Sequence, residues 1–184
     1  MSVTPQHIKE VLANADQLYS ADEVQKAVDK MAAEISDKLK DSNPLVLCVM
    51  VGGLIPAGWL LPRLHFPMNM DYIHATRYRG NTSGGTLHWI AKPSMSLDDR
   101  VVLIIDDILD EGITLTEIVK DCRAQGAREV YTAALVEKKH NRNMGDKATF
   151  IGLEVEDRYV FGCGMDYKGY LRNLPGIYAV KENE

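Results

Sequence analysis

The sequence predicts an α/β protein with an open, mainly parallel sheet and helices on both faces. Uninterrupted apolar runs at residues 45–51, 101–105 and 130–136 are typical of strands buried on both faces. Segments with apolar residues at helical spacing separate these runs, and this alternation favours a parallel sheet. The 184-residue chain contains no internal repeat and no Pro/Gly/Ser-rich linker, so we expect a single domain.

Two helices are predicted before the first buried strand. Pro5 is well placed to open a helix that reaches about Leu18. Ser20 starts the second helix, because Glu23 three residues later completes a capping-box pattern. The apolar face of this second helix is Val24, Ala27, Val28, Met31, Ile35 and Leu39.

Helical and extended patterns alternate along the rest of the chain. They predict a helix over 54–64, strands over 70–78 and 86–91 on either side of the glycine-rich stretch 79–85, the strand 101–105, a helix that ends near Gly126, and the strand 130–136. Beyond Phe150 the segments become short and rich in glycine and aromatic residues. We expect this last part to cover a crevice at the sheet edge.

Residues 101–114 are the most informative stretch. The apolar strand leads into Asp106 and Asp107, then into Asp110-Glu111-Gly112-Ile113-Thr114, and then into a helical pattern. A strand, an acidic pair, a glycine turn and a helix N-terminus together indicate an anion-binding crevice at the carboxyl edge of the sheet. The acids suit a ligand with hydroxyls or a metal, which favours a sugar phosphate. A looser pattern of this kind would leave simple helix capping as an equal alternative.

A second glycine pair, Gly52-Gly53, directly follows the first buried strand. Its spacing fits an ordinary tight turn. It also fits a backbone that lets a diphosphate approach closely, since adjacent strand ends of such a sheet face one crevice.

The full 101–114 string resembles the phosphoribosyl-diphosphate (PRPP) signature of type I phosphoribosyltransferases. Further segments, in sequence order, are similar to the 6-oxopurine (hypoxanthine-guanine) members: 48–53 to the diphosphate loop, Thr76-Arg77-Tyr78 to the mobile loop, 135–138 to the purine-reading strand, 156–162 to the purine-stacking segment, and 164–167 with Arg172 to the closing motif. The resemblance implies a core over about 41–149, a hood from about 1–20 and 150–184, and a cis peptide bond between Met50 and Val51.

The implied reaction transfers the 5-phosphoribosyl group of PRPP to N9 of hypoxanthine or guanine. Asp110 would act on the purine N7 proton. The implied PRPP-binding residues are Gly52, Gly53, Asp106, Asp107, Asp110, Glu111, Gly112, Ile113, Thr114 and Arg172. The implied purine-binding residues are Lys138, Tyr159, Val160 and Asp166, and Arg77 and Tyr78 belong to the mobile loop. Asp106, Asp107 and Asp166 would hold Mg²⁺.

Some residues also fit other roles, and some differ from the family pattern. Taken singly, Lys138 fits a solvated surface charge and Tyr159 a core aromatic. Four residues depart from the commonest family pattern, which bears on affinity and purine preference: Val51 in place of a basic residue, Arg77 in place of the loop serine, Asp106 in place of Glu, and the acidic Glu111 beside the 5-phosphate. Other classes left open are a phosphoribosyltransferase for xanthine or another base, and a PRPP- or nucleotide-sensing regulator on the same fold.

Bulk properties restrict the partners and the location. A formal charge of −5 argues against broad nucleic-acid binding, which usually needs a basic face. Three cysteines without C-x-x-C spacing favour buried thiols in a reducing compartment. Neither a signal peptide nor an apolar run long enough to cross a bilayer is visible. We therefore expect a cytoplasmic protein without membrane partners, and the resemblance suggests a homodimer or homotetramer.

Overall fold

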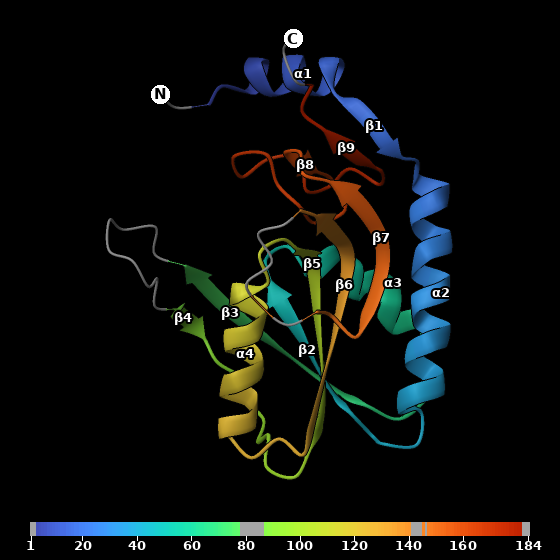
Figure 1. Cartoon of the computed structure of the whole chain (residues 1–184), viewed down its shortest axis with the longest axis vertical. Helices are drawn as coiled ribbons and strands as arrows, with labels where there is room; N and C mark the ends of the chain where they lie inside the picture. Colours follow the sequence, from blue (N-terminus) through green and yellow to red (C-terminus); the bar gives the residue numbers. More distant parts are fainter. Residues whose placement is uncertain (1–2, 78–86, 141–144, 146, 182–184) are drawn as a thin grey trace.

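A six-stranded sheet forms the centre of the molecule (Figure 1). The computed structural model describes residues 3–77, 87–140, 145 and 147–181. In spatial order the strands are β4 (Leu87–Ala91), β3 (Asn69–Arg77), β2 (Leu45–Met50), β5 (Val101–Leu109), β6 (Glu129–Lys139) and β7 (Phe150–Glu156). Every neighbouring pair is parallel except β3 and β4. The predicted mainly parallel α/β fold is therefore confirmed.

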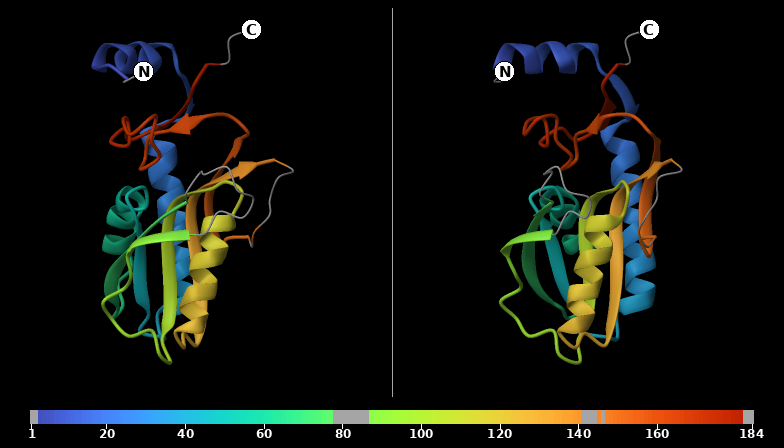
Figure 2. Two further views of the ribbon diagram at one scale, coloured as in Figure 1. Left: turned by 90° about the vertical axis from the view of Figure 1, so that its left-hand side faces the viewer. Right: turned by 60° about the vertical axis from the view of Figure 1, so that its left-hand side comes forward.

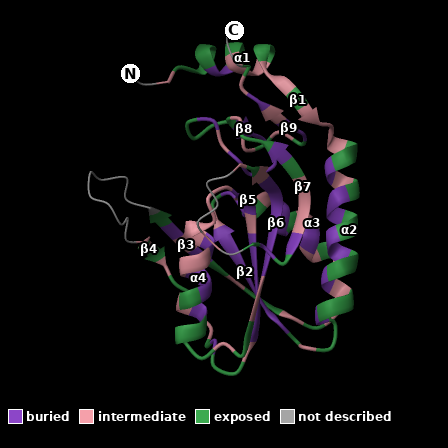
Figure 3. Cartoon of the chain, in the orientation of Figure 1, coloured by how far each residue is buried: buried purple, intermediate pink, exposed green. Residues whose placement is uncertain are grey.

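Helices cover both faces of this sheet (Figure 2). α4 (Ile113–Ala124) packs on one face, and α2 (Ala21–Leu39) and α3 (Leu54–Leu60) pack on the other. Successive side chains of β5 point to opposite faces of the sheet: Ile104 packs in the apolar cluster beneath α4, and Leu103 packs in the cluster beneath α2 and α3. Buried residues therefore run along the central strands (Figure 3), which explains the unbroken apolar runs.

The ends of α2 and α4 form as the sequence predicts. At the start of α2, the Glu23 N–H donates to Ser20 Oγ and the Ser20 N–H donates to the Glu23 carboxylate at 2.8 Å, which completes the capping box. After α4, Gly126 adopts φ +90°. The Ala127 N–H then donates to the Cys122 carbonyl at 3.1 Å, which closes the helix in a Schellman motif.

A second, smaller sheet lies above the carboxyl end of the main sheet (Figures 1 and 2). Its order is β1 (Asp16–Tyr19), β9 (Ile177–Ala179) and β8 (Val160–Phe161). α1 (Pro5–Asn14) packs on it through Ile8, which joins Phe161 and Tyr167 in a separate apolar cluster. The chain ends thus build the hood together.

Several segments differ from their sequence prediction. The helix expected over 54–64 is an α-helix only to Leu60 and continues as a 3₁₀ helix over Leu61–Arg63. The helix expected to reach about Leu18 ends at Asn14, because the next residues pair with β9 as strand β1. Residues 150–156 were expected to start the hood but pair with β6 as the edge strand of the main sheet. The strand expected over 101–105 continues to Leu109, so its acidic pair lies within the strand.

A cis peptide bond and the lengths of the helices can be compared with the sequence predictions. The peptide bond between Met50 and Val51 is cis, as the family resemblance implies. Within the described ranges, no helix has the length and apolar character to cross a membrane.

Candidate active site

Gly52, Asp107 and Gly164 meet at the carboxyl end of the main sheet. They come from the loop after β2, from β5 and from the hood. A Cβ on Gly52 would fall on the Asp107 carboxylate, and one on Gly164 would strike the Gly52 carbonyl oxygen. Gly164 also has φ +107°, a conformation that glycine adopts without strain. The three backbone segments can meet this closely only because both positions lack a side chain.

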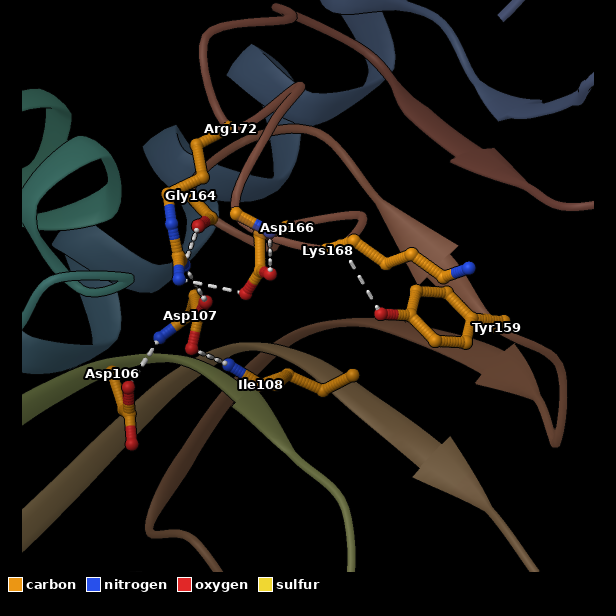
Figure 4. A network of polar contacts seen from close by, with 9 residues as sticks. Asp106, Asp107, Ile108, Tyr159, Gly164, Asp166, Lys168 and Arg172 are labelled. Atoms are coloured by element: carbon orange, nitrogen blue, oxygen red, sulfur yellow. Dashed lines mark hydrogen bonds and ion pairs between the residues drawn. The ribbon is translucent and has the colours of Figure 1, made fainter. Parts of the chain in front are cut away.

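Asp106 and Asp107 are held by the backbone at the end of β5 (Figure 4). The Asp107 N–H donates to Asp106 Oδ1, and the Ile108 N–H donates to Asp107 Oδ1, both at 2.9 Å. Asp107 is only 8% exposed. Burial raises the pKa of both carboxyl groups, and the neighbouring Asp107 charge raises the pKa of Asp106 further. Such a pair favours a ligand that brings hydroxyl donors or a cation.

Arg172 links the acidic pair to the hood (Figure 4). Its Nη2 lies 2.7 Å from Asp166 Oδ1, and its Nη1 lies 3.9 Å from Asp107 Oδ2 and donates to the Gly164 carbonyl at 2.6 Å. The Gly169 N–H donates to the other Asp166 oxygen at 2.6 Å. The guanidinium therefore lies between two carboxylates and places a positive charge at the carboxyl end of the main sheet.

A turn from Asp110 leads from β5 into α4. Gly112 is the N-cap residue with φ +77°, and its carbonyl accepts from the Thr116 N–H at 2.9 Å. Ile113 and Thr114 are the first residues of the helix. The first N–H groups of a helix have no partners within it and carry the positive end of its dipole. This turn can therefore receive a phosphate.

Asp110 is held by two basic side chains from the end of β6. Lys138 Nζ lies 3.1 Å from Asp110 Oδ2, and His140 Nε2 lies 2.6 Å from Asp110 Oδ1. Burial alone would raise the pKa of Asp110, but the hydrogen bonds from His140 and Lys138 outweigh it and bring this pKa below its ordinary value. Asp110 is thus an anionic acceptor at neutral pH, and its side chain remains 45% exposed.

Sequence reasoning missed His140. Residues two apart on a strand share a side, so Lys138 and the residue two positions later were candidates for the same site. The signal was the strand predicted over 130–136, which extends to Lys139 in the structure and so brings His140 to the same strand end.

Tyr159 and Val160 present a ring and a backbone carbonyl from the hood. The Tyr159 side chain is half exposed, its ring meets Tyr167 edge to face with centroids 5.3 Å apart, and its hydroxyl accepts from the Lys168 N–H (Figure 4). The Tyr159 carbonyl accepts from the Val180 N–H at 2.9 Å. Because carbonyls alternate along a strand, the Val160 carbonyl points away from β9, toward the open edge of β8.

Two alternatives from the sequence can now be judged. Lys138 is not a solvated surface charge, since its side chain is 12% exposed and paired with Asp110. Tyr159 is not a core aromatic, since the residue is 50% exposed.

Comparison with known proteins places the chain in a family. Residues 14–168 match the family described as the phosphoribosyl transferase domain. The chain belongs to this family. It is 34% identical over 165 residues to the hypoxanthine-guanine phosphoribosyltransferase of Bacillus subtilis, covering 89% of this chain and 92% of that protein. It is 31% identical over 167 residues to the hypoxanthine-guanine-xanthine phosphoribosyltransferase of Tritrichomonas foetus, covering 90% and 91%.

Solved structures agree in fold. A hypoxanthine phosphoribosyltransferase from Staphylococcus aureus matches with a TM-score of 0.87 at 23% identity, covering 92% of this chain and 94% of that one. A hypoxanthine-guanine-xanthine phosphoribosyltransferase matches with a TM-score of 0.84 at 28% identity, covering 92% and 99%. The predicted resemblance to hypoxanthine-guanine phosphoribosyltransferases is confirmed.

The resemblance divides the predicted residues into a phosphate and ribose side, with Gly52, Gly53, Asp106, Asp107, Glu111, Gly112, Ile113, Thr114 and Arg172, and a base side, with Asp110, Lys138, Tyr159, Val160 and Asp166. In the structure, Gly52 lies against Asp107, and Arg172 lies near both Asp107 and Asp166. Lys138 pairs with Asp110, and Tyr159 and Val160 lie in the hood. Of the predicted mobile loop, Arg77 is the last residue of β3 and Tyr78 lies outside the described residues.

The carboxylates alone do not form a metal cage. Among the described residues, no group of three or more His, Cys, Asp or Glu side chains is placed to hold a metal ion. Mg²⁺ usually keeps several waters and takes one or two carboxylates together with substrate phosphates. The carboxylates of Asp106 and Asp107, close to the helix N-terminus at Gly112, suit a Mg²⁺ ion of this type.

Proposed function

We propose that this protein transfers the 5-phosphoribosyl group from PRPP to N9 of hypoxanthine or guanine, which gives the nucleoside monophosphate and diphosphate. The observation that carries the proposal is the Asp110–Lys138 pair beside the Asp106–Asp107 strand end. The pair offers an acceptor and a donor to adjacent atoms of a 6-oxopurine, and the strand end offers carboxylates to a ribose. The names of the relatives described above support this assignment.

PRPP is assigned to the phosphate and ribose side of the crevice. The α4 N-terminus would receive the 5-phosphate through Gly112, Ile113 and Thr114. The Gly52-Gly53 backbone and Arg172 would contact the diphosphate, and the Asp106–Asp107 pair would accept from the ribose hydroxyls. Asp106, Asp107 and Asp166 are the proposed holders of Mg²⁺, which when bound neutralises the leaving diphosphate.

Bond breaking leaves positive charge on the anomeric carbon, as in glycosyl transfer generally. Asp106 and Asp107 would lie near this charge, and their backbone hydrogen bonds hold them in place without substrate. Fixed carboxylates that need no reorganisation stabilise such a transition state most effectively. The raised pKa values of the pair mean that a cationic partner binds best when both carboxyl groups ionise.

The base side selects an oxo group at C6. Asp110 would accept the N7 proton, and Lys138 would donate to O6. The 6-amino group of adenine offers no acceptor to an ammonium, so adenine is excluded. Tyr159 would stack on the purine, and the Val160 carbonyl would accept from N2 of guanine.

We also propose a cytoplasmic homodimer or homotetramer. The three cysteines are buried free thiols, as is usual in a reducing compartment. Exposed apolar side chains on β3, on β4, directly after β2 and at the start of α3 support self-association: Met70, Tyr72, Ile90, Val51 and Leu54. Light scattering on the purified protein measures the assembly directly.

A turnover assay tests the reaction. The protein is incubated with PRPP and Mg²⁺ and with hypoxanthine, guanine, xanthine or adenine, and diphosphate release is measured. We expect release with hypoxanthine or guanine, none with adenine, and loss of activity with a chelator. Xanthine is included because the Tritrichomonas foetus relative is named for it. PRPP binding without turnover on any base would contradict the proposal and favour a PRPP-sensing regulator, which a salt-dependent shift on RNA or DNA would then support.

A further inference from the structure

His140 is the most buried member of the group around Asp110. It follows the last residue of β6, and its side chain is 4% exposed, against 45% for Asp110. The two side chains are 2.6 Å apart from Nε2 to Oδ1. The proposed reaction does not use this histidine.

The direction of the hydrogen bond follows from the charge of Asp110. An ionised carboxylate only accepts hydrogen bonds, so the hydrogen lies on His140 Nε2. Each carboxylate oxygen has about two acceptor positions. His140 uses one on Oδ1 and Lys138 uses one on Oδ2, which leaves each oxygen able to accept one more hydrogen.

Purine binding would change the hydrogen bonds that Lys138 and Asp110 make. Lys138 must donate to O6 while Asp110 receives the N7 proton, and these two purine atoms are close neighbours. As the ammonium turns toward O6, its hold on Asp110 Oδ2 weakens. The His140 contact is on the other oxygen and comes from a buried side chain, so purine entry leaves it in place.

We propose that His140 is a positioning residue for the base-transfer step: by donating to Oδ1 it fixes the plane of the Asp110 carboxylate, so that the remaining acceptor positions face the purine. This inference rests on the proposed function. Reactive groups held at the correct angle lower the barrier without a contact of their own to the substrate. His140 therefore affects turnover on the purine, whereas PRPP affinity depends on Asp106, Asp107 and the α4 N-terminus.

Substitutions that keep or remove the donor test this role. His140→Leu removes it, His140→Gln keeps an amide N–H near the position of Nε2, and His140→Asn draws the amide nitrogen back from Asp110. His65→Leu is the matched control, because His65 is exposed and its Nε2 contacts the Pro62 carbonyl outside the crevice. The measurements are kcat and KM for hypoxanthine, the Kd for PRPP, and the melting temperature of each variant.

We expect His140→Leu and His140→Asn to lower kcat roughly tenfold or more, the usual effect of losing a hydrogen bond to a charged group. The Kd for PRPP should stay within about twofold of the parent value, because the substitutions leave the residues proposed to bind PRPP unchanged. His140→Gln should recover most of the turnover, and His65→Leu should match the parent protein.

Equal kcat for the parent and His140→Leu overturns the proposal, as does an equal loss in the Gln and Leu variants. A PRPP affinity that falls in step with kcat also overturns it, because that result indicates a general structural role. If His140→Leu does not fold, the comparison of Gln with Asn gives the same decision. A parent protein without turnover on any base refutes the proposed function itself, and this outcome is separate because it appears before any variant is made.

Discussion

The carboxylate of Asp107 lies in the space where a side chain on Gly52 would begin. Gly52→Ala must therefore displace either the acidic strand end or the loop after β2. We expect the substitution to lower the free energy of unfolding by about 1–3 kcal/mol, as overpacking of a tight contact does. We also expect PRPP binding to be lost, because the shift occurs in the crevice. Urea unfolding and PRPP titration measure the two effects.

Gly58→Ala is the matched control for this change. Gly58 lies in α3, and nothing is within 4 Å of the position its Cβ would take. Alanine in a helix is more favourable than glycine, so this variant should gain about 0.5–1 kcal/mol and bind PRPP normally. Equal behaviour of the two variants would contradict the assignment of a close approach at Gly52.

Asp106→Asn should raise the stability of the folded protein at high pH while it lowers the activity. The folded protein raises the pKa of Asp106 above the unfolded value of 3.8, so above that pH the folded state binds more protons than the unfolded state. Stability is therefore lost as the pH rises through the folded pKa. Asparagine keeps the Oδ1 acceptor for the Asp107 N–H and removes the charge.

We expect Asp106→Asn to be more stable than the parent protein by roughly 1–2 kcal/mol at pH 8, with a smaller difference at pH 4.5, and to lose most turnover. Chemical denaturation at the two pH values checks the first part. A variant that is less stable at pH 8 would show that burial of this charge is already compensated in the parent.

Arg172→Met should weaken PRPP binding. Its guanidinium lies between Asp107 and Asp166, and its loss leaves both carboxylates without that cation. We expect the Kd for PRPP to rise about tenfold or more, since a contact to a charged group is lost. Arg128→Met is the control, because its pair with Asp99 is largely exposed and such pairs contribute little. Calorimetric titration of PRPP should show a change only in the first variant.

Lys138→Gln should relax the choice of base. Loss of the ammonium removes the donor to O6, so kcat/KM for hypoxanthine should fall roughly 10- to 100-fold while the ratio of adenine to hypoxanthine use rises. Lys139→Gln is the neighbouring control. Lys139 pairs with the buried Glu137 and with Glu154, so its loss should lower the melting temperature and leave the base ratio unchanged.

A shift of the base ratio in both variants would contradict the separate roles assigned to the two lysines. An assay in which adenine and hypoxanthine compete in one reaction mixture measures the base ratio of each variant.

The central part of the fold follows from local patterns, whereas the hood does not. Residues 101–105 are apolar because both faces of β5 are covered, and a run of this kind is readable without coordinates. β1 was mistaken for a helix end because its partner, Ile177–Ala179, is about 160 residues away and leaves no local signal. β7 was assigned to the hood because its sequence carries a glycine and two acids rather than an unbroken apolar run.

The candidate site divides in the same way. The acidic pair and the glycine loop were predicted from contiguous motifs, and the structure brings them into contact. Arg172 and Asp166 were placed by resemblance, and only the hood geometry explains why Arg172 lies between Asp166 and Asp107. His140 was missed because its significance depends on where β6 ends, and strand ends are the least certain part of a sequence-based assignment.

The place of β9 between β1 and β8 orders events during synthesis. Translation runs from the N-terminus, so the ribosome makes β2, β5 and α4 long before residues 177–179 emerge. Pairings between distant residues also form slowly, because a long loop must close first. A nascent chain can therefore complete the turn at the start of α4 before it receives β9, the strand that pairs with the segment after Tyr159.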